Sequence, residues 1–343
     1  MVVDISQLAA TTIDTTGLST FTNSTGGKMD LSEVGNEFVE FTATSEDAIT
    51  TDVGDIIVND DGASLDVDAV GAISQMGGTS INTADSVDLT SETSTVTLGD
   101  IMTDKLTVVA EQAIETDLAT TVNATTSVDL LSITQSITLG DINTTDLTAT
   151  AQLDIDSNLG TTLDTEETVT LTSIKGGITL HDIETKVLLV EAELAIDTQA
   201  STTIDALTSV DLTSHTQSIT MGDINTTDLT ATAQLDIDSN LGTTLDAEES
   251  VTLTSKMGGI TLHDIETKVL KAEAELAIDT QTATTIDALT SVDLTSNTQS
   301  ITLGDINTAD LTATAELAID ANPLTTIDSE TTVTLTSNMS TVE

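Results

Sequence analysis

The sequence predicts an all-β fold: a parallel β-solenoid, or β-helix, made of 41-residue repeats with two coils per repeat. Three observations predict it. The same residue pattern restarts every 41 positions, apolar and polar residues alternate within each copy, and the repeated region contains no aromatic residue. A fixed period of this size indicates a repeat architecture, and alternation with period two indicates strands buried on one side.

The repeat is clearest in residues 209–249, because the same pattern begins again at Ser250. Copies start at one constant interval, at Ser45, Ser86, Ser127, Thr168, Ser209, Ser250, Ser291 and Thr332. We predict a divergent N-terminal cap or attachment segment over residues 1–44, seven repeats over 45–331 and a truncated eighth repeat over 332–343. A decayed first copy is the alternative interpretation of the first segment, since end units of repeat arrays differ from the rest.

Alternation within one copy predicts the strands. Every second residue from Leu229 to Ile237 is apolar and the residues between them are polar, which predicts a half-buried strand over 229–237. The alternation slips by one position at Gly222-Asp223, and a slip at a glycine predicts a corner or bulge.

Corresponding positions in successive copies form apolar ladders, which we expect to fill the interior. With two coils per copy, each coil has about 20 residues and neighbouring coils are about 4.8 Å apart. The four ladders are Val87, Val128, Val169, Val210, Val251, Val292 and Val333; Leu89, Leu130, Leu171, Leu212, Leu253, Leu294 and Leu335; Ile101, Ile142, Ile183, Ile224, Ile265 and Ile306; and Ile114, Ile155, Ile196, Ile237, Ile278 and Ile319.

Three other architectures share some of these features. A propeller has blades of this length, but its blades normally carry aromatic residues. Tandem sandwich domains of two copies each would explain why alternate copies match best, but the chain has no linkers between copies. A trimeric fibre of interwoven chains is the third alternative.

The chain is strongly acidic, with 58 Asp and Glu residues, seven Lys and Arg residues together and a formal net charge of −51. This charge argues against nucleic acid as a partner, and no apolar run is long enough for membrane insertion. Three acidic ladders repeat with the copies: Asp100, Asp141, Asp182, Asp223, Asp264 and Asp305; Glu115, Asp156, Asp197, Asp238, Asp279 and Asp320; and Asp164, Asp205, Asp246, Asp287 and Asp328.

Aligned carboxylates repel one another, and Ca²⁺ or other divalent cations would relieve the repulsion. We therefore name the ladder that starts at Asp100 as the candidate metal site. The alternative, which the sequence favours, is a solvated acidic face that keeps the protein soluble. Neither the calcium-binding nonapeptide repeat nor an EF-hand loop is present.

The sequence predicts no catalytic site and no enzyme. There is no cysteine. His181 and His263 occupy the same repeat position, where neighbouring copies have glycine, and we expect them to be surface residues. Thr-x-Thr pairs such as Thr230 and Thr232 are similar to ice-binding faces, but they occur in only some copies. A DNA-mimic inhibitor has only the charge in its favour.

The segments VTLTS, GDINTTDLTATA and LDIDSN resemble the repetitive coils of filamentous-haemagglutinin-type adhesins, and they are similar to β-helical stretches of phage tail fibres and spikes. The resemblance covers residues 86–343. It implies a rigid rod that is secreted or carried on a virion, and it assigns no catalytic or receptor-binding residue.

We therefore expect a non-enzymatic structural protein, a subunit of an extracellular filament, fibre or surface layer. The alternative is the shaft of a bacterial adhesin or phage tail fibre. An exposed strand edge favours pairing with another chain, so the expected partner is a second copy stacked end to end. Phe38, Phe41, Val333 and Leu335 are the candidate assembly residues, and the expected location is extracellular, on a cell surface or on a virion.

Overall fold

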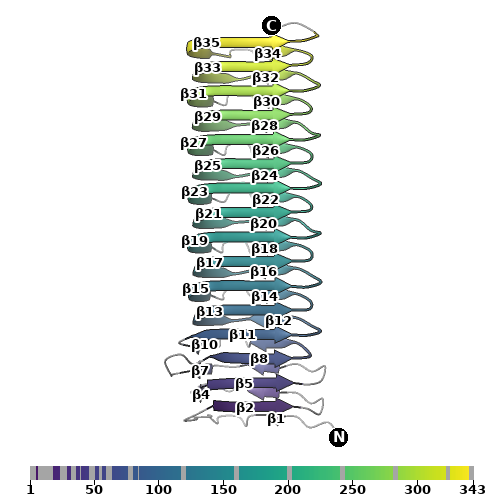
Figure 1. Cartoon of the computed structure of the whole chain (residues 1–343), viewed down its shortest axis with the longest axis vertical. Coiled ribbons are helices and arrows are strands. Elements are labelled where there is room, and N and C mark those ends of the chain that lie inside the picture. The colour runs from purple at the N-terminus through teal and green to yellow at the C-terminus, as the bar shows by residue number, and fades with distance from the viewer. Residues whose placement is uncertain are drawn as a thin grey trace. The chain divides into compact units, whose positions relative to one another are not determined.

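The protein is all-β. The computed structural model in Figure 1 contains strands and turns and no helix among the residues that it describes. It describes the backbone alone for residues 5–6, 18–23, 29–31, 36–38, 40–45, 51–53 and 56–58, and backbone and side chains for 64–75, 80–83, 85–116, 121–157, 162–198, 203–239, 244–280, 285–321 and 325–339.

The chain divides into two compact units, Met1–Ile174 and Lys175–Glu343, and each unit by itself is a parallel β-solenoid. The strands of the first unit are β1 (Ile5–Ser6), β2 (Leu18–Asn23), β3 (Met29–Leu31), β4 (Asn36–Phe38), β5 (Glu40–Ser45), β6 (Thr51–Val53), β7 (Ile56–Val58), β8 (Leu65–Ala69), β9 (Ile73–Gln75), β10 (Ser80–Thr83), β11 (Ser86–Ser91), β12 (Val96–Leu98), β13 (Asp100–Ala110), β14 (Ile114–Thr116), β15 (Thr121–Ser132), β16 (Ile137–Leu139), β17 (Asp141–Ala151), β18 (Ile155–Ser157) and β19 (Thr162–Ser173). The strands of the second unit are β20 (Ile178–Leu180), β21 (Asp182–Ala192), β22 (Ile196–Thr198), β23 (Thr203–Ser214), β24 (Ile219–Met221), β25 (Asp223–Ala233), β26 (Ile237–Ser239), β27 (Thr244–Ser255), β28 (Ile260–Leu262), β29 (Asp264–Ala274), β30 (Ile278–Thr280), β31 (Thr285–Ser296), β32 (Ile301–Leu303), β33 (Asp305–Ala315), β34 (Ile319–Ala321) and β35 (Ile327–Ser337).

Each regular coil contains one long strand and one short strand. The long strands β23, β25 and β27 pair with one another in parallel, and so do the short strands β22, β24 and β26. Ile219 pairs with Ile196 before it and with Ile237 after it, so the coil that leads to Ile219 is longer than the coil that follows it. The two unequal coils together make one repeat, which confirms the predicted pair of coils per repeat and excludes the propeller and the sandwich.

The long strand bends in its middle. The pairing of β23 with β25 shifts in register between Ala206 and Ser209, and the two residues at this bend, Leu207 and Thr208, are both exposed. In the partner strand, the Oγ1 of Thr226 donates to the carbonyl oxygen of Asp228 at 3.3 Å. A register shift of this kind is a β-bulge, which turns the strand. The bend divides each long strand into a first arm and a second arm, so that a coil has three straight segments.

One ladder of the interior alternates between large and small side chains. In the second unit, Leu212 pairs with Ala231, Ala231 with Leu253, and Leu253 with Ala272, and all four are buried. Protein interiors are packed as densely as organic crystals, so a large residue at this position suits a small neighbour. This alternation is one respect in which two successive coils differ. The predicted apolar ladders are buried throughout, except at Val333 and Leu335 in β35.

One predicted strand is wrong. Residues 229–237 do not form a single strand, because β25 ends at Ala233 and β26 begins at Ile237. Leu235 lies on the turn between them and is 36% exposed. Its backbone N–H donates to the carbonyl oxygen of Gln217 in the preceding turn, so the turns are stacked as the strands are. The predicted corner at Gly222-Asp223 is confirmed, because β24 ends at Met221 and β25 begins at Asp223.

The strands before β8 are stacked in the same way. Strand β2 pairs in parallel with β5, and β5 pairs in parallel with β8, which brings Phe41 opposite Leu65. Phe38 ends β4 and lies opposite Val58 of β7. The side chains of Phe38 and Phe41 lie outside the described residues. The cap segment over 1–44 and the truncated repeat over 332–343 therefore stay predictions.

Leu253→Ala tests the packing of the interior. Both neighbours of Leu253 in the ladder are alanines, which cannot fill the space that the change creates, so we expect a loss of about 2–5 kcal/mol in the free energy of unfolding. Urea unfolding followed by far-ultraviolet circular dichroism measures it. The control is Leu289→Ala at a side chain that is 71% exposed, which should change the free energy by less than about 0.5 kcal/mol. Equal losses in the two variants would contradict the assignment of the core.

Candidate functional site

The acidic ladder that starts at Asp100 holds neighbouring coils together. Each carboxylate lies at the start of a long strand, and its Oδ1 accepts a hydrogen bond from a backbone N–H at the start of the next long strand. In the second unit, the N–H of Thr244 donates to Asp223 at 2.8 Å. The same bond joins Asp100 to Thr121, Asp141 to Thr162, Asp182 to Thr203, Asp264 to Thr285 and Asp305 to Thr326, at 2.7–2.9 Å.

This geometry gives the predicted metal ladder a structural role. Successive members are one repeat, and therefore two coils, apart, which corresponds to about 10 Å. Ca²⁺ binds oxygen at about 2.3–2.6 Å, so one ion cannot contact two successive members. Among the side chains that the structure describes, no three or more potential ligands are grouped as a metal site requires. Cation binding by this ladder stays a prediction.

In the second acidic ladder, threonine residues lie between successive aspartates. Asp197 pairs with Thr220, Thr220 with Asp238, and Asp238 with Thr261 on the outward face of the short strands. Two carboxylates on this face are therefore separated by a neutral residue. Strands β8 and β11 lack such a spacer, because Asp66 lies directly opposite Asp88. There, partial burial and then the nearby carboxylates of Asp68 and Asp88 raise the pKa of Asp66.

The third acidic ladder lines a groove along the bend of the long strands. In the second unit, two adjoining hollows of about 430 and 440 Å³ share Asp246 and Glu248. The amide of Asn225 donates to Asp205 at 3.0 Å, which partly compensates one carboxylate. Glu266 lies between Asp246 and Asp287 in the same row, and the amide of Asn307 donates to Asp287 at 3.1 Å. The groove is thus an acidic, open surface.

Lys268, which lines the groove, is hydrogen-bonded to Glu249. The ammonium of Lys268 donates to the carboxylate of Glu249, and this hydrogen bond raises the pKa of Lys268. Two exposed leucines, Leu207 and Leu289, also line the hollows, at 70% and 71% exposure. The groove therefore combines carboxylates, one paired ammonium and apolar side chains, which together can attract a cationic group.

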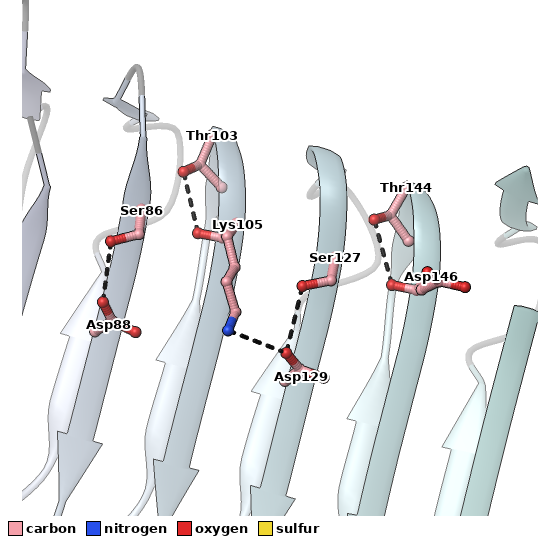
Figure 2. Close-up of polar contacts among 8 residues, drawn as sticks. All are labelled: Ser86, Asp88, Thr103, Lys105, Ser127, Asp129, Thr144 and Asp146. Carbon is pink, nitrogen blue, oxygen red and sulfur yellow. Dashed lines mark hydrogen bonds and ion pairs between the residues drawn. The ribbon is translucent and has the colours of Figure 1, made fainter. Parts of the chain in front are cut away.

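Hydroxyl groups and a lysine compensate carboxylates in the first unit, as Figure 2 shows. The hydroxyl of Ser127 donates to Asp129 at 3.3 Å, and the ammonium of Lys105 lies 3.8 Å from the same carboxylate. Nearby, hydrogen bonds from Thr125 and Thr126 lower the pKa of Asp104. Hydrogen bonds and an ammonium therefore partly neutralise the charge of these carboxylates.

Two of the histidines are buried, which corrects the expectation of surface residues. His181 and His263 are 8% and 7% exposed. The backbone N–H of His263 donates to the Oγ of Ser239 at 2.8 Å, and its Nδ1 lies 3.2 Å from the same oxygen. The third histidine, His215, is exposed and its Nε2 lies 2.6 Å from a carboxylate oxygen of Glu191.

The buried histidines belong to a set of matched pairs between neighbouring coils. Where the repeat has glycine in place of histidine, its partner in the preceding coil is a larger residue than serine. The N–H of Gly222 donates to Thr198 Oγ1, and the N–H of Gly99 donates to Gln75 Oε1 at 2.9 Å. A Cβ added at Gly99 would lie 2.8 Å from the Gln75 side chain. A larger residue on one side therefore accompanies glycine on the other, and the smaller serine accompanies histidine.

The threonine rows of the second arm are short. Thr230 lies opposite Thr252, and Thr232 lies opposite Thr254, but the next coil places Lys271 and Glu273 in these two rows. The row of Thr230 is therefore two coils long, and the row of Thr232, which begins at Thr213, is three coils long. The surface offers no long flat threonine array in this part of the second unit, which weakens the similarity to ice-binding faces.

The predicted assembly residues lie in different units. Val333 is 48% exposed in β35, whereas Val251 and Val292 at the same repeat position are buried. Leu335 is half-buried. Sequence reasoning missed another set of exposed apolar residues, on the turns that follow the second arms. The sequence does contain a pattern that indicates this set, because the repeat position of Leu235 is leucine in several successive copies.

Comparison with protein-family models, curated proteins and solved structures finds no match to this chain. The described residues contain no helix that could span a bilayer. The repeated geometry is therefore the basis on which a function can be proposed.

Asp223→Ala tests the bond between neighbouring coils. We expect a loss of about 1 kcal/mol in the free energy of unfolding, because the N–H of Thr244 loses a charged acceptor. The control is Asp238→Ala, whose carboxylate lies on the outward face of a short strand. Removing that charge should leave the stability unchanged or raise it slightly, because repulsion falls. Urea unfolding measures both, and a larger loss for Asp238→Ala would refute the proposed role.

Exchange of a Ser–His pair for a Thr–Gly pair tests volume matching. Ser239→Thr adds a methyl group beside a buried imidazole, and His263→Gly leaves a cavity, so each change alone should cost about 1–3 kcal/mol. The double variant recreates the pair found at Thr198 and Gly222. We expect it to recover at least about 1 kcal/mol relative to the sum of the single changes. Additive losses in the double-mutant cycle would show that the two positions are independent.

Proposed function

We propose that this protein is a non-enzymatic structural protein, a stiff β-solenoid that serves as a subunit of an extracellular filament, fibre or surface layer. The observation that carries the proposal is the in-register stacking of coils, in which alternating side chains such as Leu253 and Ala272 fill the interior. A β-solenoid of this kind is compatible with a rigid structural rod. In solenoids each repeat contacts its neighbours and extends the structure in one direction.

The repetition of the surface also supports a structural role. Outward positions return copy after copy, as the alternation of Asp197, Thr220 and Asp238 does. An active site normally depends on a few residues that differ from their surroundings. A surface made of recurring rows is better suited to uniform contacts along its length, and its carboxylates are suited to a medium in which abundant cations screen them.

We propose end-to-end stacking with a second copy as the mode of assembly. The support is the parallel, in-register pairing of neighbouring coils, as between Leu253 and Ala272. A strand edge of this kind pairs with another strand, and any coil of the array has the matching ladder spacing. Head-to-tail contacts of this type produce open filaments.

Val333→Asp with Leu335→Asp tests end-to-end stacking. Negative-stain electron microscopy of the unchanged protein, concentrated in salt with divalent cations, should show filaments longer than one molecule. The double variant should show single molecules, because two added charges would be buried at the junction. The control is Leu207→Asp with Leu289→Asp on the groove, which should still elongate. Single molecules in all three samples would contradict the filament and favour the shaft of an adhesin or tail fibre.

A further inference from the structure

A row of apolar side chains runs along the turns that follow the second arms. In the second unit it consists of Leu194, Leu235, Met257, Leu276, Leu317 and Met339, and we name this row the turn stripe. Leu194 and Leu276 are half-buried, and the other four are 36–70% exposed. The first unit has a corresponding row, Ile133, Leu153 and Ile174, at 40–50% exposure.

The turns that carry the stripe are hydrogen-bonded to one another. The N–H of Met257 donates to Gln234 at 2.9 Å, next to Leu235, and the N–H of Leu276 donates to Gly258 at 2.9 Å, next to Met257. Neighbouring turns are therefore one coil, or about 4.8 Å, apart. Leu235, Met257 and Leu276 lie on three successive turns and form an apolar cluster, whereas the turns before and after them carry Thr216 and Thr298.

The turn stripe lies on the least acidic corner of the second unit. Its turns carry the carboxylates Glu193, Asp236, Glu275 and Glu316, and the turns between them carry Lys175, Lys256 and His215. At the bend, by contrast, almost every coil contributes carboxylates: Glu184, Asp205, Asp228, Asp246, Glu248, Glu249, Glu266, Asp287, Asp310, Asp328 and Glu330. Two molecules that each carry a formal charge of −51 repel least where their carboxylates are fewest.

We propose that a second copy of this chain packs side by side along the turn stripe. The apolar leucines recur once per repeat, which places them about 10 Å apart on a regular backbone. A partner that covers all of them must present apolar groups at the same interval on an equally regular edge, and a second copy does so. Two copies related by a twofold axis would bring this edge against itself, as isologous contacts do.

Exposure alone does not define this contact. Leu207 and Leu289 are more exposed than most residues of the stripe, but Asp205, Glu248 and Asp287 surround them in the groove. Two copies that met at the groove would bring carboxylates against carboxylates, at a cost that salt screens only in part. Leu207 and Leu289 are therefore suitable controls, because they are exposed apolar residues like those of the stripe but are surrounded by carboxylates.

Sedimentation equilibrium in high salt tests the proposal, with Val333→Asp and Leu335→Asp present in every sample so that end-to-end stacking is blocked. The protein with an intact stripe should approach twice the monomer mass as its concentration rises. Leu235→Gln, Met257→Gln and Leu317→Gln together should weaken this association by about tenfold or more, because apolar anchors contribute most of an interface's affinity. Circular dichroism verifies that each variant is folded.

The control is Leu207→Gln with Leu289→Gln, which should associate as strongly as the protein with an intact stripe. A monomer at every concentration would overturn the proposal, and so would equal weakening by the groove and stripe variants. Electron microscopy separates this contact from end-to-end stacking, since lateral pairing doubles the width of a particle and end-to-end stacking increases its length. Either contact can therefore fail while the other is confirmed.

Discussion

The packing of unlike coils on each other is the constraint on which the rest of the structure depends. Leu253 fits because Ala231 and Ala272 lie above and below it, and His263 fits because its partner is the small Ser239. In these two rows a large residue in one coil accompanies a small one in the next, so two successive coils are unlike. The rows of isoleucines, such as Ile196, Ile219 and Ile237, are the same in every coil.

The same alternation organises charge on the outside. Separation or compensation of aligned carboxylates lowers the repulsion in a stack with this net charge. Thr220 separates Asp197 from Asp238, Asn225 donates to Asp205, and Asp223 binds the next coil through a backbone N–H. What is left is an uneven surface, acidic at the bend and nearly neutral at the turns. This unevenness is what gives a structural protein a preferred side for contact.

The sequence was sufficient to predict the coils, the buried ladders and the corner at Gly222, because these depend on periodicity along one copy. It was not sufficient where the outcome depends on how neighbouring coils are offset. The offset between Ser239 and His263 in successive coils explains why the histidine is buried. Asp223 and Thr244 lie next to each other in neighbouring coils, so the carboxylates of the first acidic ladder accept hydrogen bonds from backbone N–H groups. Apolar and polar residues alternate across the turn at Leu235 as they do along a strand, so the sequence predicts a strand there. The hydrogen bonds of this turn are made to the neighbouring coil.

Deletion of residues 209–249 tests most directly whether pairs of unlike coils are the unit of this fold. The deletion joins Thr208 to Ser250 and puts Val251 in the place of Val210, so we predict a folded protein with an unchanged β-sheet circular dichroism per residue and a similar melting temperature. Deletion of only residues 209–227 removes a single coil in register, because Asp228 takes the place of Ser209 and Leu229 that of Val210. Coils of the same kind then become neighbours, and this variant should be less stable than the first. Equal stability of the two deletion variants, or loss of structure in the first, would contradict the account.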